Sequence, residues 1–164
     1  MTDSCYNSSI FKVTMQLTHK TAIAAAIAGI FGTIVFDLAG LIVMGHWWNV
    51  PKLLASKIGI GLPGGVILHY GNGILLAVIF AGLIPLFFGP VWARALQYIT
   101  LQTIFGVWFF MFPLLDMGAL GLEAGSLMPL MTLITHWAYA LVVGILYPLL
   151  AERLAPAIQF AGVR

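Results

Sequence analysis

Charged side chains are scarce in this sequence. It holds seven Lys or Arg residues and five Asp or Glu residues, which together make 7% of the chain, whereas soluble domains are about one quarter charged. This scarcity excludes a water-soluble domain of ordinary composition, and it leaves no basic stripe with which to bind nucleic acid. Hydrophobic residues instead make up 62% of the chain, with a mean hydropathy of +1.06. We therefore expect the lipid bilayer to be its solvent and its first partner.

Cysteine and the common catalytic motifs are also lacking. Cys5 is the single cysteine, which excludes an internal disulfide, a CxxC redox pair and a thiolate metal cage. The sequence contains no P-loop, no HExxH or GxSxG motif and no Rossmann glycine pattern in a usable context. It also shows no internal repeat, which disfavours a secondary transporter unless the chain acts as an oligomer. We expect no enzyme activity from this chain on its own.

Four apolar stretches are each long enough to cross a bilayer, which takes about 20 residues. They cover about 21–45, 64–88, 91–115 and 128–150. Short connections between them favour antiparallel neighbours. The sequence therefore predicts an all-α integral membrane protein, an up-down bundle of four transmembrane helices within 21–155. A polar tail at 1–20 and a short tail at 156–164 flank this domain.

The basic residues predict how the spans are oriented. With four spans, both termini and the connection between the second and third spans lie on one side. Basic residues are commoner on the cytoplasmic side of membrane proteins. This predicts a multi-pass protein of the cell inner (plasma) membrane with cytoplasmic termini. Five basic residues belong to the predicted cytoplasmic side and two to the other: Lys12, Lys20, Arg94, Arg153 and Arg164 against Lys52 and Lys57.

The first outward loop has the features of a short helix lying on the membrane surface. Asn49 is a suitable N-cap, and Pro51 fits the first helical turn. Lys52 and Lys57 then alternate with leucine and isoleucine, which is typical of an amphipathic segment. We expect a short interfacial helix here, ended by the glycines that precede the second span.

Two histidines lie at similar depth in different spans. His69 is about five residues inside the second span and His136 about eight residues inside the fourth, a difference of roughly 4 Å at helical rise. Glycines around His69 are expected to leave room beside its ring. Facing histidines on separate membrane helices can ligate a haem iron axially. His69 and His136 are therefore the candidate ligands of a haem b.

Two other interpretations of this histidine pair stay open. Together with Asp37, or with Asp116 or Glu123, the histidines could bind a transition metal, because imidazole and carboxylate suit zinc, copper or iron. Alternatively, both histidines are ordinary hydrogen-bonding residues, and the nearby glycines serve contacts between helices.

Asp37 is the clearest acid inside a span, roughly 12 Å from the outward end of the first helix. Buried acids in membranes are costly and often functional. Asp37 is thus either a proton-linked or ligand-binding group or a hydrogen-bonded acid that fastens two helices. The third span carries five amide or hydroxyl side chains, of which Gln102 lies near mid-membrane: Gln97, Tyr98, Thr100, Gln102 and Thr103. Such groups join helices by hydrogen bonds, line a water path or hold a quinone head, and packing is the simplest interpretation.

These observations lead to one main functional hypothesis and two alternatives. The chain is expected to be a small membrane subunit of a larger redox or respiratory complex, bound to other membrane protein subunits. The first alternative is a structural accessory subunit without a cofactor, which contacts its partner through the small residues of the first span. The second is a proton-coupled carrier that acts as an oligomer, with Asp37 as the proton site.

Overall fold

The computed structural model describes residues 18–154, and within this range every regular element is a helix. The polar tail predicted at 1–20 lies almost wholly outside the described residues, as do Cys5 and the tail at 156–164. The all-helical prediction is confirmed, and four helical segments are long and apolar enough to cross a membrane. The elements are α1 (His19–Met44), α2 (Val50–Ile58), α3 (Leu62–Leu83), η1 (Ile84–Leu86), α4 (Val91–Gln102), η2 (Thr103–Met111), α5 (Phe112–Leu114), η3 (Ala119–Gly121) and α6 (Met128–Leu154).

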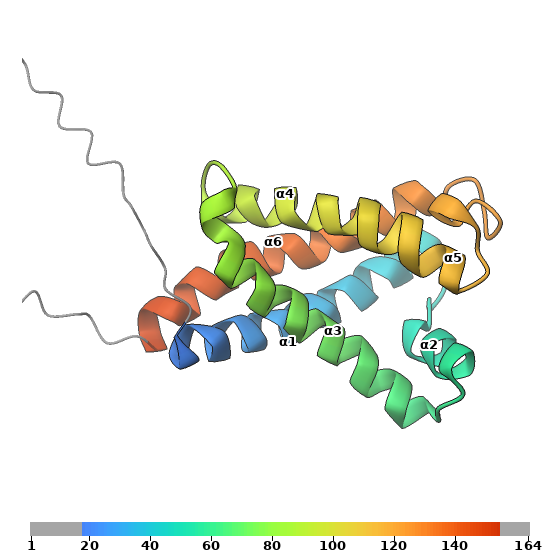
Figure 1. Ribbon diagram of the computed structural model, residues 1–164, viewed down its shortest axis with the longest axis horizontal. Helices are drawn as coiled ribbons and strands as arrows, with labels where there is room; N and C mark the ends of the chain where they lie inside the picture. The colour runs from blue at the N-terminus through green and yellow to red at the C-terminus, as the bar shows by residue number, and fades with distance from the viewer. Residues whose placement is uncertain (1–17, 155–164) are drawn as a thin grey trace, which may run out of the picture.

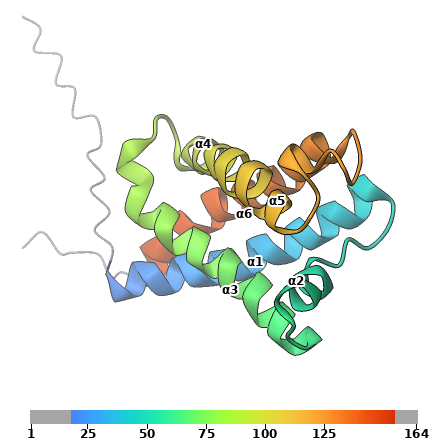
Figure 2. The ribbon, with the colours of Figure 1, turned by 45° about the vertical axis from the view of Figure 1, so that its right-hand side comes forward.

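The long helices alternate in direction along the chain (Figure 1). α1 and α6 form the central pair, with α3 packed on α1 and α4 packed on α6. α3 has little contact with the span formed by α4, η2 and α5, and the two diverge toward the end of the molecule where α2 lies (Figure 2). We call this the α2 end. The short helix α2 packs against the start of α3.

Small residues allow α1 to approach its two neighbours closely. Gly29 of α1 faces the backbone of α3, where an added Cβ would lie 2.7 Å from the Gly73 carbonyl oxygen. Gly32 faces α6, where an added Cβ would lie 2.8 Å from the ring of Tyr139. The small-residue face of α1 is therefore buried inside the chain itself. This corrects the expectation that the same face contacts a partner subunit.

Local capping explains where α1 and α2 begin. The Thr18 hydroxyl accepts a hydrogen bond from the Thr21 amide, and the Thr21 hydroxyl oxygen accepts one from the Thr18 amide, a reciprocal cap at the start of α1. Asn49 caps α2 as predicted, since its Oδ1 atom accepts a hydrogen bond from the Lys52 amide at 2.9 Å. α2 then rests on Gly65, whose missing side chain leaves space for the Pro51 carbonyl group.

The third span departs from the regular α-helix expected over 91–115. It is helical throughout Val91–Leu114, but η2 in its middle is a π-helix of nine residues. π-helical turns are rare and are often found at functional sites. This stretch follows Gln102 directly, and its side chains Val107 and Met111 face the cavity described below.

Candidate functional site

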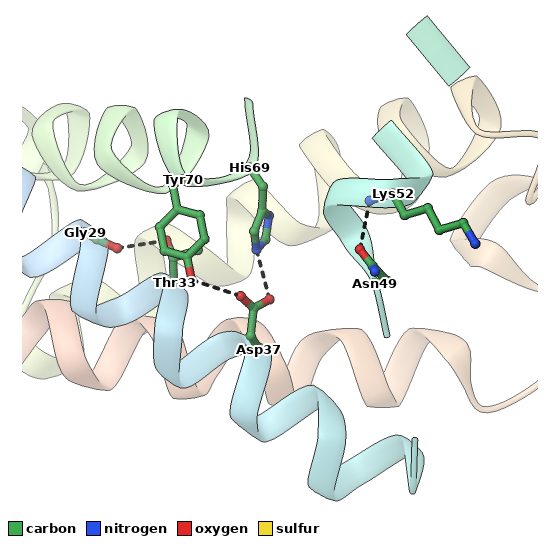
Figure 3. A network of polar contacts seen from close by, with 7 residues as sticks. All are labelled: Gly29, Thr33, Asp37, Asn49, Lys52, His69 and Tyr70. Atoms are coloured by element: carbon green, nitrogen blue, oxygen red, sulfur yellow. Dashed lines mark hydrogen bonds and ion pairs between the residues drawn. The ribbon is translucent and has the colours of Figure 1, made fainter. Parts of the chain in front are cut away.

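Asp37 and His69 form a buried carboxylate–imidazole pair between α1 and α3. The His69 Nε2 atom lies 2.9 Å from Asp37 Oδ1, and the two side chains are 9% and 10% exposed. The Tyr70 hydroxyl donates a longer hydrogen bond of 3.4 Å to the other carboxylate oxygen. Figure 3 shows both contacts converging on Asp37. Asp37 therefore joins two helices, which was one of the two roles predicted for it.

His136 is held differently, by the backbone of its own helix. Its Nδ1 atom lies 2.7 Å from the Thr132 carbonyl oxygen. A carbonyl oxygen only accepts hydrogen bonds, so Nδ1 carries the proton and donates. In the neutral ring, Nε2 is then an acceptor, and no hydrogen bond from the described residues reaches it.

His69 and His136 both line one cavity of about 320 Å³ at the α2 end. Most of its wall is apolar, and α2 contributes Val50, Leu53, Leu54 and Ile58 to it. Thr132 and Tyr139 line it beside His136 at helical spacing, so one polar strip of α6 faces this space. The polar side chains around the cavity are Thr33, His69, Asn72, Gln102, Thr132, His136 and Tyr139.

Phe36 packs against both imidazole rings. Its ring centroid lies 5.7 Å from that of His69 and 4.9 Å from that of His136, which it meets edge to face. A haem ligated by both histidines through Nε2 would require His69 to leave Asp37 and would disturb the packing of Phe36 on the two rings. The contacts therefore favour two hydrogen-bonding histidines that share a cavity. The haem itself stays a prediction.

The other acids proposed as metal ligands lie outside the cavity. Asp116 forms an ion pair of 2.5 Å with Lys57 of α2, and Glu123 lies beside Gly118 in the loop before α6. Between residues 18 and 154, no three His, Cys, Asp or Glu side chains are grouped so that they could hold a metal ion. The structure thus gives the metal alternative no support.

Most of the glycines near His69 allow close contacts with neighbouring segments and do not create empty space beside the ring. Gly65 accommodates α2, and Gly73 accommodates the Thr33 side chain of α1. Gly71 has no neighbour within 4 Å of an added Cβ. The cavity therefore arises mainly from the divergence of α3 and the third span, which the position of glycines in the sequence could not reveal.

Gln102 is the site residue that the sequence indicated only weakly. Its Oε1 atom is buried and has no hydrogen-bond partner among the described residues. Leaving a buried acceptor without a hydrogen-bond partner lowers the stability of a protein by roughly 1–3 kcal/mol. Gln102 also lines the cavity, immediately before the π-helix begins. A mid-membrane glutamine was a weak signal for this site, because packing was the simpler interpretation.

Comparison with known proteins identifies no relative. The chain matches no protein-family model, and neither a curated protein nor a solved structure is similar to it. The interpretation of the site therefore rests on its own geometry.

We predict that Trp108→Phe modestly destabilises the site. The Trp108 indole N–H donates a 3.1 Å hydrogen bond to the Thr132 hydroxyl oxygen, which links the π-helix to α6. Losing this bond should lower the free energy of unfolding by about 1 kcal/mol. Unfolding in mixed detergent micelles would measure it. Trp92→Phe is a suitable control because Trp92 is 48% exposed, and an equal loss in both variants would contradict the prediction.

Proposed function

We propose that this chain is a small multi-pass membrane protein that holds a small molecule in the α2-end cavity, and that it serves as a membrane subunit of a redox-type complex. One observation carries the proposal: histidines from two different apolar helices line the same cavity. Small-molecule sites are typically concave and mostly apolar, with a few polar groups that orient the ligand. Polar and ionisable side chains within membrane helices are costly, which supports a functional reason for their presence.

The distribution of basic residues supports a position for the chain in the membrane. Lys20, Arg94 and Arg153 lie at the starts of α1 and α4 and near the end of α6, which share the end of the bundle opposite α2. We assign this end to the cytoplasmic side of the plasma membrane. α2 then lies at the outer surface, where Lys52 and Lys57 reach the headgroups and its leucines cover the cavity.

A cavity-filling variant tests whether the space holds a molecule. Leu76 lines the cavity, whereas the neighbouring Leu75 does not and is 55% exposed. We expect the wild-type protein, purified in mild detergent, to carry an organic molecule that native mass spectrometry detects and solvent extraction releases. Leu76→Trp should lower its occupancy about tenfold, which corresponds to roughly 1.4 kcal/mol of binding free energy. Leu75→Trp should leave it unchanged.

Two results would contradict the proposal: wild-type protein without any bound molecule, or equal occupancy in the two tryptophan variants. An optical spectrum of the same samples tests the haem prediction. A Soret band that disappears in both His69→Ala and His136→Ala would show haem as the bound group. Absence of the band would remove the haem prediction and leave the two histidines as hydrogen-bonding residues.

A further inference from the structure

We propose that the cavity takes an uncharged, lipid-soluble ring compound that carries hydroxyl groups, of the hydroquinone class. This inference rests on the proposed function, since it names the chemistry of the molecule that the cavity would hold. It follows from the polar atoms that face the space, from the charge and shape of its walls, and from the route by which a ligand can enter.

Two acceptor atoms of residues that line the cavity have no hydrogen-bond partner among the described residues. His136 Nε2 is an acceptor because Nδ1 donates to the Thr132 carbonyl oxygen. Gln102 Oε1 is a second acceptor, buried and unpaired. These two atoms belong to α6 and to the third span, whose residues His136 and Gln102 both line the cavity. A ligand that satisfies both must donate hydrogen bonds, as two hydroxyl groups on one ring can do.

The charge of the wall excludes an anionic ligand. No Lys or Arg is found among the described residues that line the cavity. Asp37 lies directly behind His69 and would repel a phosphate or carboxylate. A phospholipid headgroup or a fatty acid carboxylate therefore does not fit this site, whereas an uncharged hydroxyl group does.

The size and composition of the wall favour a ring. A volume of about 320 Å³ is at the small end of the range of about 300–1,000 Å³ for ligand pockets, so the cavity suits a ring-sized head. Aromatic side chains from four parts of the chain contribute to its wall, and flat rings pack well against them. These aromatic residues are Phe36, Trp48, Phe112 and Tyr139.

The entrance faces the apolar surface of the molecule. Ile58 and Leu68 both line the cavity and remain 59% and 40% exposed, so they mark its rim. They belong to α2 and α3, on the side where α3 diverges from the third span (Figure 2). A ligand with an alkyl tail can thus place its ring in the cavity and leave its tail among the lipid chains.

Binding of an alkyl-tailed hydroquinone, kept under argon, tests this inference with full-length protein in detergent. Its dimethyl ether is the matched probe, because it has the same ring and tail but cannot donate hydrogen bonds. We expect the hydroquinone to bind about tenfold more tightly than the ether, as one or two hydrogen bonds would give. Quenching of tryptophan fluorescence would report binding, since Trp48 lines the cavity.

Two variants test the acceptor atoms separately. Gln102→Leu and His136→Phe should each weaken hydroquinone binding about tenfold and leave binding of the ether nearly unchanged. Gln97→Leu is the control: this amide bonds the Phe88 backbone away from the cavity, so its loss should not alter binding of either probe.

The outcomes separate this inference from the proposed function. Equal binding of hydroquinone and ether, or unaltered hydroquinone binding in Gln102→Leu and His136→Phe, would overturn the ligand class. If hydroquinone does not bind but the wild-type protein carries another molecule that Leu76→Trp removes, the ligand class fails and the proposed function stands. If neither hydroquinone nor any other molecule is found, both fail.

Discussion

His69→Leu is expected to lower the free energy of unfolding by about 1–3 kcal/mol, the usual cost of leaving a buried hydrogen-bonding group without its partner. The Asp37 carboxylate would remain 10% exposed, with only the 3.4 Å hydrogen bond from Tyr70. Asp37→Leu should be similarly costly, because it leaves the imidazole without its acceptor. Unfolding of the purified protein in mixed detergent micelles would measure both losses.

A double-mutant cycle provides the control. The variant with both Asp37→Leu and His69→Leu should be more stable than the sum of the two single losses predicts, because it leaves no unpaired polar group between α1 and α3. Tyr70→Phe should cost less than about 1 kcal/mol, since its hydrogen bond is long. Strictly additive losses in the cycle would show that the two side chains are not coupled.

Gly29→Leu is expected to prevent α1 and α3 from packing. The added Cβ alone would lie 2.7 Å from the Gly73 carbonyl oxygen and 2.9 Å from Ile74 Cα. Both neighbours are backbone atoms, which cannot turn away as a side chain can. The destabilisation should therefore exceed the roughly 1–3 kcal/mol that is typical of extra methylene groups in a core. The yield of monodisperse protein and its thermal stability in detergent would measure it.

Gly71→Leu is the matched control for this substitution, because an added Cβ at Gly71 meets nothing within 4 Å. It should be neutral or slightly stabilising, since glycine is a poor helix former by about 1 kcal/mol relative to alanine. Similar losses for Gly29→Leu and Gly71→Leu would contradict the packing described here. Because Gly29 faces α3 of the same chain, we expect the loss even in protein purified without any partner subunit.

Features that depend on local sequence were predictable. Hydropathy alone predicts the four long helices, and Asn49 with Pro51 predicts the start of α2, because capping and apolar runs are set by residues close together in the chain. Helical rise placed His69 and His136 at similar depth, and both line the same cavity.

Features that depend on helix rotation and packing were not predictable. Depth does not show that Phe36 packs against both imidazole rings, or that the Pro51 carbonyl group rests on Gly65. The unpaired Gln102 oxygen depends on which neighbouring groups reach it, and none of those described is a hydrogen-bond donor to it. These contacts form between segments far apart in the chain, which one sequence without relatives does not reveal.

The π-helix of Thr103–Met111 has a consequence for how the chain tolerates insertions and deletions. Each wider turn holds one more peptide unit than an α-turn does, so the stretch accommodates extra length without lengthening its loops. Deleting one residue there would let the segment tighten into an α-helix, so the side chains on its two flanks would keep nearly the same relative orientation. The same deletion in a regular α-helix would turn one flank against the other by about 100°. We therefore expect this stretch to tolerate a deletion better than the other three spans do.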